Sequence, residues 1–225
     1  VWLGPWSMRA DRKQYSFIVS AEQDDIGISL QLLPGNKRMI LQGERGLSRK
    51  SATPGNASFY YSFTRLPTRG EIRIGDKFYT VEGNSWMDRE WSSSALDKDQ
   101  AGWDWFALQL DDGREVMYYQ MRNKQGGAHA FSSGKLVEKD GRVHTLLPNQ
   151  VMLMPSRYWQ ARDGQRYPVK WSMQIAEHQL ALEVVAMIDD QLLDHPGLYW
   201  LGAVGVSGSH KCIGYLDLSG YYSRE

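Results

Sequence analysis

The chain has 225 residues, and its 26 lysines and arginines balance 26 aspartates and glutamates, so the formal net charge is zero. A neutral chain gives no electrostatic footprint for nucleic acid or for an anionic membrane surface. Its one cysteine, Cys212, excludes an internal disulfide and a cysteine-based metal site. The apolar runs are too short to cross a bilayer, so no transmembrane segment is predicted.

Short strands separated by turns are predicted along the first half of the chain. Residues 1–6 read as an irregular entry, whereas residues 26–33 alternate apolar with small or polar side chains. Gly75-Asp76 predicts a hairpin turn. The predicted strands of this half are residues 15–19, 26–33, 39–42, 57–65, 71–74, 77–83 and 86–91. Residues 92–101 are polar and are predicted to link two domains, at 1–98 and 99–225.

The second half repeats the same pattern, with turn signals such as Asp112-Gly113 and Asp140-Gly141 between apolar runs. Many short strands at regular spacing predict an all-β barrel or sandwich. The strands predicted here are residues 104–110, 115–122, 132–138, 151–155, 169–175, 181–187, 198–206 and 213–221.

The stretch from Gly83 to Arg122 holds four of the nine tryptophans, interleaved with acids, arginines and tyrosines. Strand periodicity places every second side chain on the same face. In its first piece, Trp86, Asp88 and Glu90 therefore share one face, and Trp91 points to the other.

In the second piece, a two-residue turn at Asp112-Gly113 would pair two strands. It would set Trp103 opposite Arg122, Trp105 opposite Gln120, and Ala107 opposite Tyr118. That mixed face is expected to form either a cavity wall or a seam between domains. The other face would be an ordinary core face, made of Phe106, Leu108, Leu110, Met117, Tyr119 and Met121. A turn longer or shorter by one residue would move the pairing.

Several segments carry a resemblance to a known family. They include GNSWMDREW (83–91), GWDWFALQLDDGREVMYYQMR (102–122), YWLGAVGVSG (199–208) and GYLDLSGY (214–221). These segments resemble the AttH-like and carotenoid 1,2-hydratase (hydroxyneurosporene synthase) proteins. The resemblance implies two lipocalin-like β-barrels in tandem, with a ligand cavity near their junction. It also implies a tryptophan-rich segment before Val1, so that the first barrel would be incomplete in these residues.

The chain departs from this family pattern at three positions. Leu192 and Leu201 stand where the resemblance implies glutamate, and Asp217 also stands in place of a glutamate. The resemblance therefore implies the scaffold more firmly than an inherited reaction. It extends to hydratases of isoprenoid double bonds and, distantly, to pericyclic cyclases.

Asp88 and Glu90 are the predicted catalytic residues. Two carboxylates on one strand face lie roughly 7 Å apart, and burial beside a like charge could keep one of them protonated. Such an acid could protonate an alkene while Trp86 shields the resulting cation. The alternative is that Asp88 and Glu90 pair with Arg89, Arg122 or backbone donors and lock the junction.

The predicted ligand-binding residues share aromatic or polar side chains on strands. They are Trp86, Trp91, Trp103, Trp105, Tyr118, Gln120, Arg122, Tyr199 and Trp200. Their alternative role is packing between domains, with a stacked arginine–tryptophan pair. The five histidines lack the spacing of a helical zinc site, so neither a metal site nor a cofactor is predicted.

The sequence thus predicts binding of a hydrophobic, isoprenoid or lipid-like small molecule in an aromatic cavity, with hydration or cyclisation of a double bond as the sharper version. The alternative is a non-enzymatic periplasmic accessory protein that works beside a membrane transporter of lipids or lipoproteins. A periplasmic or secreted location is expected, with the cytoplasm as the alternative. The two versions differ in whether an enclosed cavity or an exposed apolar patch is present.

Overall fold

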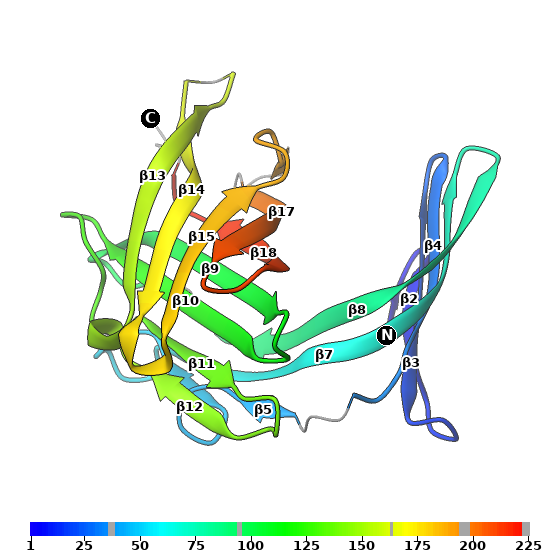
Figure 1. Ribbon diagram of the computed structural model, residues 1–225, viewed down its shortest axis with the longest axis horizontal. Helices are drawn as coiled ribbons and strands as arrows, with labels where there is room; N and C mark the ends of the chain where they lie inside the picture. Colours follow the sequence, from blue (N-terminus) through cyan, green and yellow to red (C-terminus); the bar gives the residue numbers. More distant parts are fainter. Residues whose placement is uncertain (36–38, 94–95, 163, 194–198, 222–225) are drawn as a thin grey trace. The chain divides into compact units, whose positions relative to one another are not determined.

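The computed structural model describes all residues except 36–38, 94–95, 163, 194–198 and 222–225, and its regular structure is almost entirely antiparallel β-sheet (Figure 1). Two sheets are formed, one of eight strands and one of ten. The all-β prediction is confirmed. No helix in the described residues is long and apolar enough to cross a membrane.

The first sheet has the strand order β1-β2-β3-β4-β7-β5, and β6 and β8 also pair with β7. Its strands are β1 (Trp2–Leu3), β2 (Trp6–Asp11), β3 (Ser16–Gln23), β4 (Ile26–Leu32), β5 (Ile40–Leu41), β6 (Leu47–Arg49), β7 (Ala57–Ile74) and β8 (Lys77–Trp91). The irregular entry predicted for residues 1–6 is wrong, because Leu3 of β1 pairs with Trp6 of β2.

β7 and β8 are longer than the sequence pattern predicted. β7 runs unbroken through Pro67, whose carbonyl accepts a hydrogen bond from the Leu33 amide at 2.7 Å. Gly70 allows a close approach to β4, because a Cβ atom there would lie 2.1 Å from the Ser29 carbonyl oxygen. Each strand therefore merges two predicted segments, 57–65 with 71–74 and 77–83 with 86–91.

The second sheet has the order β12-β11-β10-β9-β18-β17-β15-β14-β13, with β16 on β17. Its strands are β9 (Gln100–Leu110), β10 (Glu115–Asn123), β11 (Ser133–Val137), β12 (Val143–Leu146), β13 (Met152–Gln160), β14 (Arg166–Ile175), β15 (Leu180–Ala186), β16 (Leu192–Leu193), β17 (Tyr199–Gly208) and β18 (Cys212–Leu218). Two short 3₁₀ turns, η1 (Pro148–Gln150) and η2 (Ala176–His178), join strands. Residue 198, the predicted start of the β17 strand, lies outside the described residues.

Packing groups the chain into two units. The first unit is Val1–Ile40 with Ser62–Asp88, and the second is Leu41–Tyr61 with Arg89–Glu225. The chain passes from the first sheet to the second between Trp91 and Gln100. The predicted domains at 1–98 and 99–225 remain a prediction about folding units.

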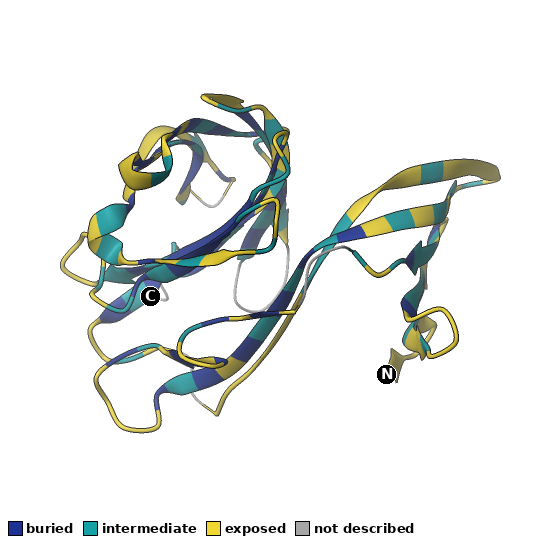
Figure 2. Ribbon diagram, turned by 60° about the horizontal axis from the view of Figure 1, so that its bottom comes forward, coloured by how far each residue is buried: buried dark blue, intermediate teal, exposed yellow. Residues whose placement is uncertain are grey.

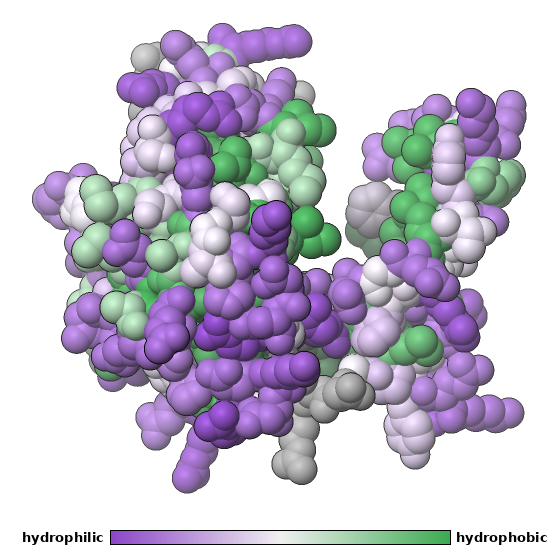
Figure 3. All heavy atoms as spheres, viewed as in Figure 1, coloured by the Kyte–Doolittle hydropathy of each residue, from purple (hydrophilic) through white to green (hydrophobic). Residues whose placement is uncertain are grey.

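The second unit holds the larger core, which Figure 2 shows as dark strands. Phe106, Trp171 and Trp200 are among its fully buried side chains. In the first unit, hydrophobic side chains such as Ile26, Ile74 and Phe78 are exposed, and green side chains are visible on that unit in Figure 3. Buried side chains of the second unit are therefore the ones whose pKa values burial can shift most.

Candidate functional site

The β9–β10 hairpin has a turn one residue longer than predicted. The Gly113 amide donates to the Leu110 carbonyl at 3.2 Å, and the Leu110 amide donates to the Arg114 carbonyl at 2.9 Å. Gly113 has a φ of +90°, the left-handed conformation that closes a three-residue loop. The paired residues are therefore Trp103 with Met121 and Trp105 with Tyr119.

This shift divides the predicted ligand-binding set between two faces of the sheet. Trp103 and Trp105 lie on one face, whereas Tyr118, Gln120 and Arg122 lie on the other, with Phe106 and the core. The predicted shared face of these five residues is wrong. The predicted core face is also wrong, and its two halves lie on different sides: Phe106, Leu108 and Leu110 on the core face, Met117, Tyr119 and Met121 opposite.

On the sheet face opposite the core, the side chains of β10 are buried. The side chains of β9, β18 and β17 on the same face include several that are only half-buried. Met117 and Tyr119 of β10 are buried, and the Tyr119 hydroxyl lies 3.0 Å from the Ser48 hydroxyl. Farther along the sheet, Trp103, Tyr199 and Asp217 are only half-buried.

Trp103, Trp105, Tyr199 and Asp217 together form what we call the aromatic–acid face. Asp217 pairs with Trp105 across β18 and β9, and the rings of Trp103 and Tyr199 have centroids 6.1 Å apart. The Trp105 indole donates to the Tyr60 hydroxyl at 3.0 Å, which fixes the ring. All three aromatic residues belong to the predicted ligand-binding set, and that role stays a prediction.

Asp217 is the acid of this face. Burial raises the pKa of Asp217 to about 6; a hydrogen bond from Trp103 lowers it, and the nearby charge of Asp104 raises it. Its Oδ1 atom is buried and has no hydrogen-bond partner among the described residues. Its neighbour across β17 is Leu201, which adds apolar surface where the family resemblance implies a glutamate. An acid with this pKa can exist in both protonation states near neutral pH.

The predicted catalytic residue Glu90 has a different environment. The Lys50 ammonium lies 2.8 Å from its Oε1 atom, and the Ser58 hydroxyl donates to the same oxygen at 2.5 Å. Lys50 in turn lies over the Tyr119 ring, 4.3 Å from its centroid. The Glu90 side chain is 39% exposed, so this ion pair lies partly in solvent.

Asp88 and its tryptophan neighbours occupy other positions along β8. Asp88 is exposed and accepts a hydrogen bond from the Ser62 hydroxyl. Trp86 is half-buried in the first unit. Trp91 is half exposed and packs on Phe59 in the second unit, with ring centroids 5.7 Å apart. The catalytic roles of Asp88 and Glu90 stay predictions that these contacts do not favour.

Arg122 and Trp200 have structural partners on the core side. Arg122 forms an ion pair with the fully buried Asp104 and stacks on Tyr221, with its Cζ atom 3.7 Å from the ring centroid. The predicted arginine–tryptophan stack is thus an arginine–tyrosine stack. The Trp200 indole donates to the Asp189 carbonyl at 2.7 Å within the core.

Asp104 is a second acid with a shifted pKa. Burial raises its pKa to about 6, although the charge of Arg122 and a hydrogen bond from Tyr221 at 2.8 Å oppose the shift. Asp104 and Asp217 lie on neighbouring strands, and the sheet separates their side chains because Asp104 pairs with Leu218. Sequence reasoning did not select Asp104, although alternation places it on the same face as Phe106.

The first unit carries an open groove of about 520 Å³. Polar and charged groups, among them Asp11, Gln31 and Arg69, form much of its wall, with Ile18, Leu30 and Val81 between them. Arg69 is held by Gln31, which accepts from its Nη2 at 3.0 Å. Ligand pockets for apolar molecules are enclosed, which this open groove is not.

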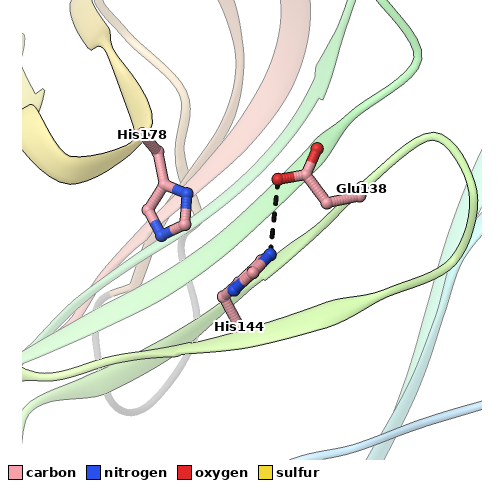
Figure 4. Close-up of side chains that lie close together, drawn as sticks. All are labelled: Glu138, His144 and His178. Atoms are coloured by element: carbon pink, nitrogen blue, oxygen red, sulfur yellow. Dashed lines mark ion pairs between the residues drawn. The ribbon is translucent and has the colours of Figure 1, made fainter.

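One group of side chains in the described residues could hold a metal ion: Glu138, His144 and His178 (Figure 4). They come from two segments distant in the sequence, so residue spacing gives no signal for them. Their geometry is analysed below.

The fold and the aromatic–acid face define a class: an all-β protein of two antiparallel sheets that presents an acid of raised pKa among aromatic rings. The chain belongs to the AttH-like family, whose profile matches residues 1–221. No curated protein matches the sequence.

Two solved structures resemble the protein over nearly its whole length. A provisionally assigned AttH from Nitrosomonas europaea is 32% identical with a TM-score of 0.89, and the match covers 97% of this chain and 68% of that one. Kievitone hydratase from Nectria haematococca is 13% identical with a TM-score of 0.79, covering 98% of this chain and 70% of that one. At the lower identity the likeness concerns the fold alone.

Proposed function

We propose that the aromatic–acid face binds a hydrophobic small molecule and that Asp217 is the proton donor in the hydration of a carbon–carbon double bond. The raised pKa of Asp217, about 6, carries this proposal, because a fraction of this carboxyl keeps its proton near neutral pH, whereas an ordinary carboxylic acid is almost fully ionised there. The AttH-like scaffold, shared with a hydratase, is the reason to test hydration before cyclisation.

The chemistry needs three contributions from the chain. The Asp217 carboxylic acid gives its proton to one alkene carbon, which leaves a carbocation on the neighbouring carbon. The rings of Trp103 and Trp105 would stabilise that cation through their negative faces. Water then adds to the cation and forms a protonated oxonium group. This group loses one proton to the Asp217 carboxylate, which leaves the hydroxyl of the product and restores the acid.

The substrate class follows from the surroundings of the acid. Two indoles, a phenol and Leu201 offer flat, apolar surface with few hydrogen-bonding groups. Prenylated aromatic compounds and acyclic isoprenoids match that surface, because their alkenes are apolar and give tertiary cations on protonation. The ligand is therefore proposed to be an isoprenoid or a lipid-like molecule with a trisubstituted double bond.

The test is turnover in water labelled with ¹⁸O. A panel of prenylated phenols and acyclic polyenes is first screened by quenching of tryptophan fluorescence. Compounds that bind are then incubated with the protein, and products are analysed by mass spectrometry for one added molecule of labelled water. Asp217→Asn should reduce kcat by at least about 100-fold while the dissociation constant changes little.

Asp88→Asn and Glu90→Gln are the matched controls, since each removes one carboxylate from β8. Both should keep turnover close to that of the unchanged protein. If Asp217→Asn kept full turnover and either control lost it, the proton donor would be on β8 and the proposal would be wrong.

A further inference from the structure

Glu138, His144 and His178 converge at the edge of the second sheet (Figure 4). Glu138 directly follows β11, His144 lies on β12, and His178 ends η2 between β14 and β15. One nitrogen of each imidazole and one carboxylate oxygen all lie within 4.8 Å of one another. The fold thus brings two hairpins together at three side chains that metals bind.

The distances already approach those of a coordination sphere. The His144 Nε2 atom lies 3.4 Å from the Glu138 Oε1 atom. Ligands about 2.0–2.1 Å from a tetrahedral zinc ion are roughly 3.3 Å apart, so this pair needs almost no movement. The histidine rings have centroids 4.7 Å apart and are tilted by 56°, so they do not stack flat. A side-chain rotation of His178 would close the remaining distance.

The backbone beneath these side chains is held by other contacts. Arg114 donates from Nη1 to the His178 carbonyl at 3.1 Å. The Glu138 amide donates to the Arg142 carbonyl at 2.8 Å and closes the β11–β12 hairpin. Gln150 donates to Glu177 at 2.8 Å and ties η1 to η2. These contacts order the backbone beneath the three side chains, so little further ordering would oppose binding.

Metal ions bind histidine through the neutral imidazole and glutamate through the carboxylate. All three side chains are half-buried, which leaves a path for an ion from solvent.

We propose that Glu138, His144 and His178 form a binding site for a divalent transition-metal ion, with Zn²⁺ as the test ion. Two imidazoles and one carboxylate suit Zn²⁺ or Fe²⁺ and do not suit Ca²⁺ or Mg²⁺, which prefer all-oxygen ligands. Three protein ligands leave a position for water. The ion would clamp the β11–β12 hairpin to η2, and this role does not depend on the function of the aromatic–acid face.

The experiment is calorimetric titration of the untagged, chelator-treated protein with ZnCl₂. One Zn²⁺ per chain with a micromolar or tighter dissociation constant is expected, together with a higher melting temperature. Cobalt(II) should give the visible absorption of a four- or five-coordinate ion. His144→Gln and His178→Gln should each weaken binding by at least about 100-fold, and Glu138→Gln by about 10-fold.

His129→Gln is the matched control. The His129 Nε2 atom also lies 3.4 Å from a carboxylate oxygen, on Asp99, but no third ligand group joins that pair in the described part of the chain. This variant should bind Zn²⁺ as the unchanged protein does. The proposal is overturned if no binding occurs, or if the folded double variant His144→Gln/His178→Gln, checked by circular dichroism, binds as tightly as before.

Discussion

The acids of β8 and the acids of the β9–β18 pair have the same chemistry in opposite environments. Glu90 is partly exposed and lies 2.8 Å from Lys50. Asp217 is half-buried, has one oxygen without a partner among the described residues, and faces indole rings. Position on a tryptophan-rich strand is therefore a poor guide to reactivity. Burial raises a carboxyl pKa, and a cationic partner opposes that rise.

Asp104 completes the comparison, because it combines complete burial with a cation. Its pKa is raised to about 6 even though Arg122 forms an ion pair with it. Desolvation thus exceeds the attraction of one guanidinium at this site. Asp104 and Asp217 together rank burial above charge pairing as the cause of a carboxyl pKa shift.

The largest effect is expected from removing the cation at the buried pair. Arg122→Ala should lower the free energy of unfolding by about 3–5 kcal/mol, because it leaves Asp104 buried and unpaired. Lys50→Ala removes the cation at Glu90 and should cost less than about 1 kcal/mol. Urea unfolding of both variants, followed by tryptophan fluorescence, measures the difference. Equal losses would contradict the ranking.

Replacing Asp217 should change the free energy of unfolding by a smaller amount and in the opposite direction. Its pKa is about 6 in the folded chain against an ordinary value of 3.8, so the folded state binds more protons between these values. The free energy of unfolding must then fall as the pH rises from about 4 to about 6. Asp217→Asn should remove this component and stabilise the protein by about 1–2 kcal/mol at pH 7.5.

The control for that variant is Glu90→Gln, which should change the free energy of unfolding by less than about 0.5 kcal/mol at the same pH. Chemical unfolding at pH 4, 5, 6 and 7.5 gives both profiles. A profile of Asp217→Asn parallel to that of the unchanged protein would show that Asp217 does not titrate in this range.

The smallest effect concerns one hydrogen bond. Trp103 donates to Asp217 and lowers its pKa against the effect of burial. Trp103→Phe keeps a ring and removes the donor, so the pKa of Asp217 should rise further. A Trp105→Phe variant removes an indole that donates to Tyr60 instead and should leave that pKa nearly unchanged. Carboxyl ¹³C titration by NMR measures both shifts.

Alternation along the chain predicted most of the strands, including the adjacent strands now seen as β9 and β10. It could not give the turn length, because Asp112-Gly113 fits a two-residue loop and a three-residue loop equally well. That single residue moved Tyr118, Gln120 and Arg122 to the core face. A register error of one always exchanges the faces of a strand.

The chemistry of the site was less predictable than the fold. The resemblance drew attention to Asp217, but its raised pKa depends on burial and on neighbours from β9 and β17, which residue spacing does not encode. The cluster of His144 with His178 was missed for the same reason. Both depend on which loops and strands meet across the second sheet.

Asp217 must keep its raised pKa, about 6, for a fraction of this carboxyl to stay protonated near neutral pH. Its carboxyl ¹³C resonance can be assigned by comparison with Asp217→Asn and followed from pH 3 to pH 8. The account predicts a midpoint close to pH 6, where the pKa of this carboxyl is placed by burial. A midpoint at or below the ordinary value of 3.8 would contradict it and leave the aromatic–acid face without its acid.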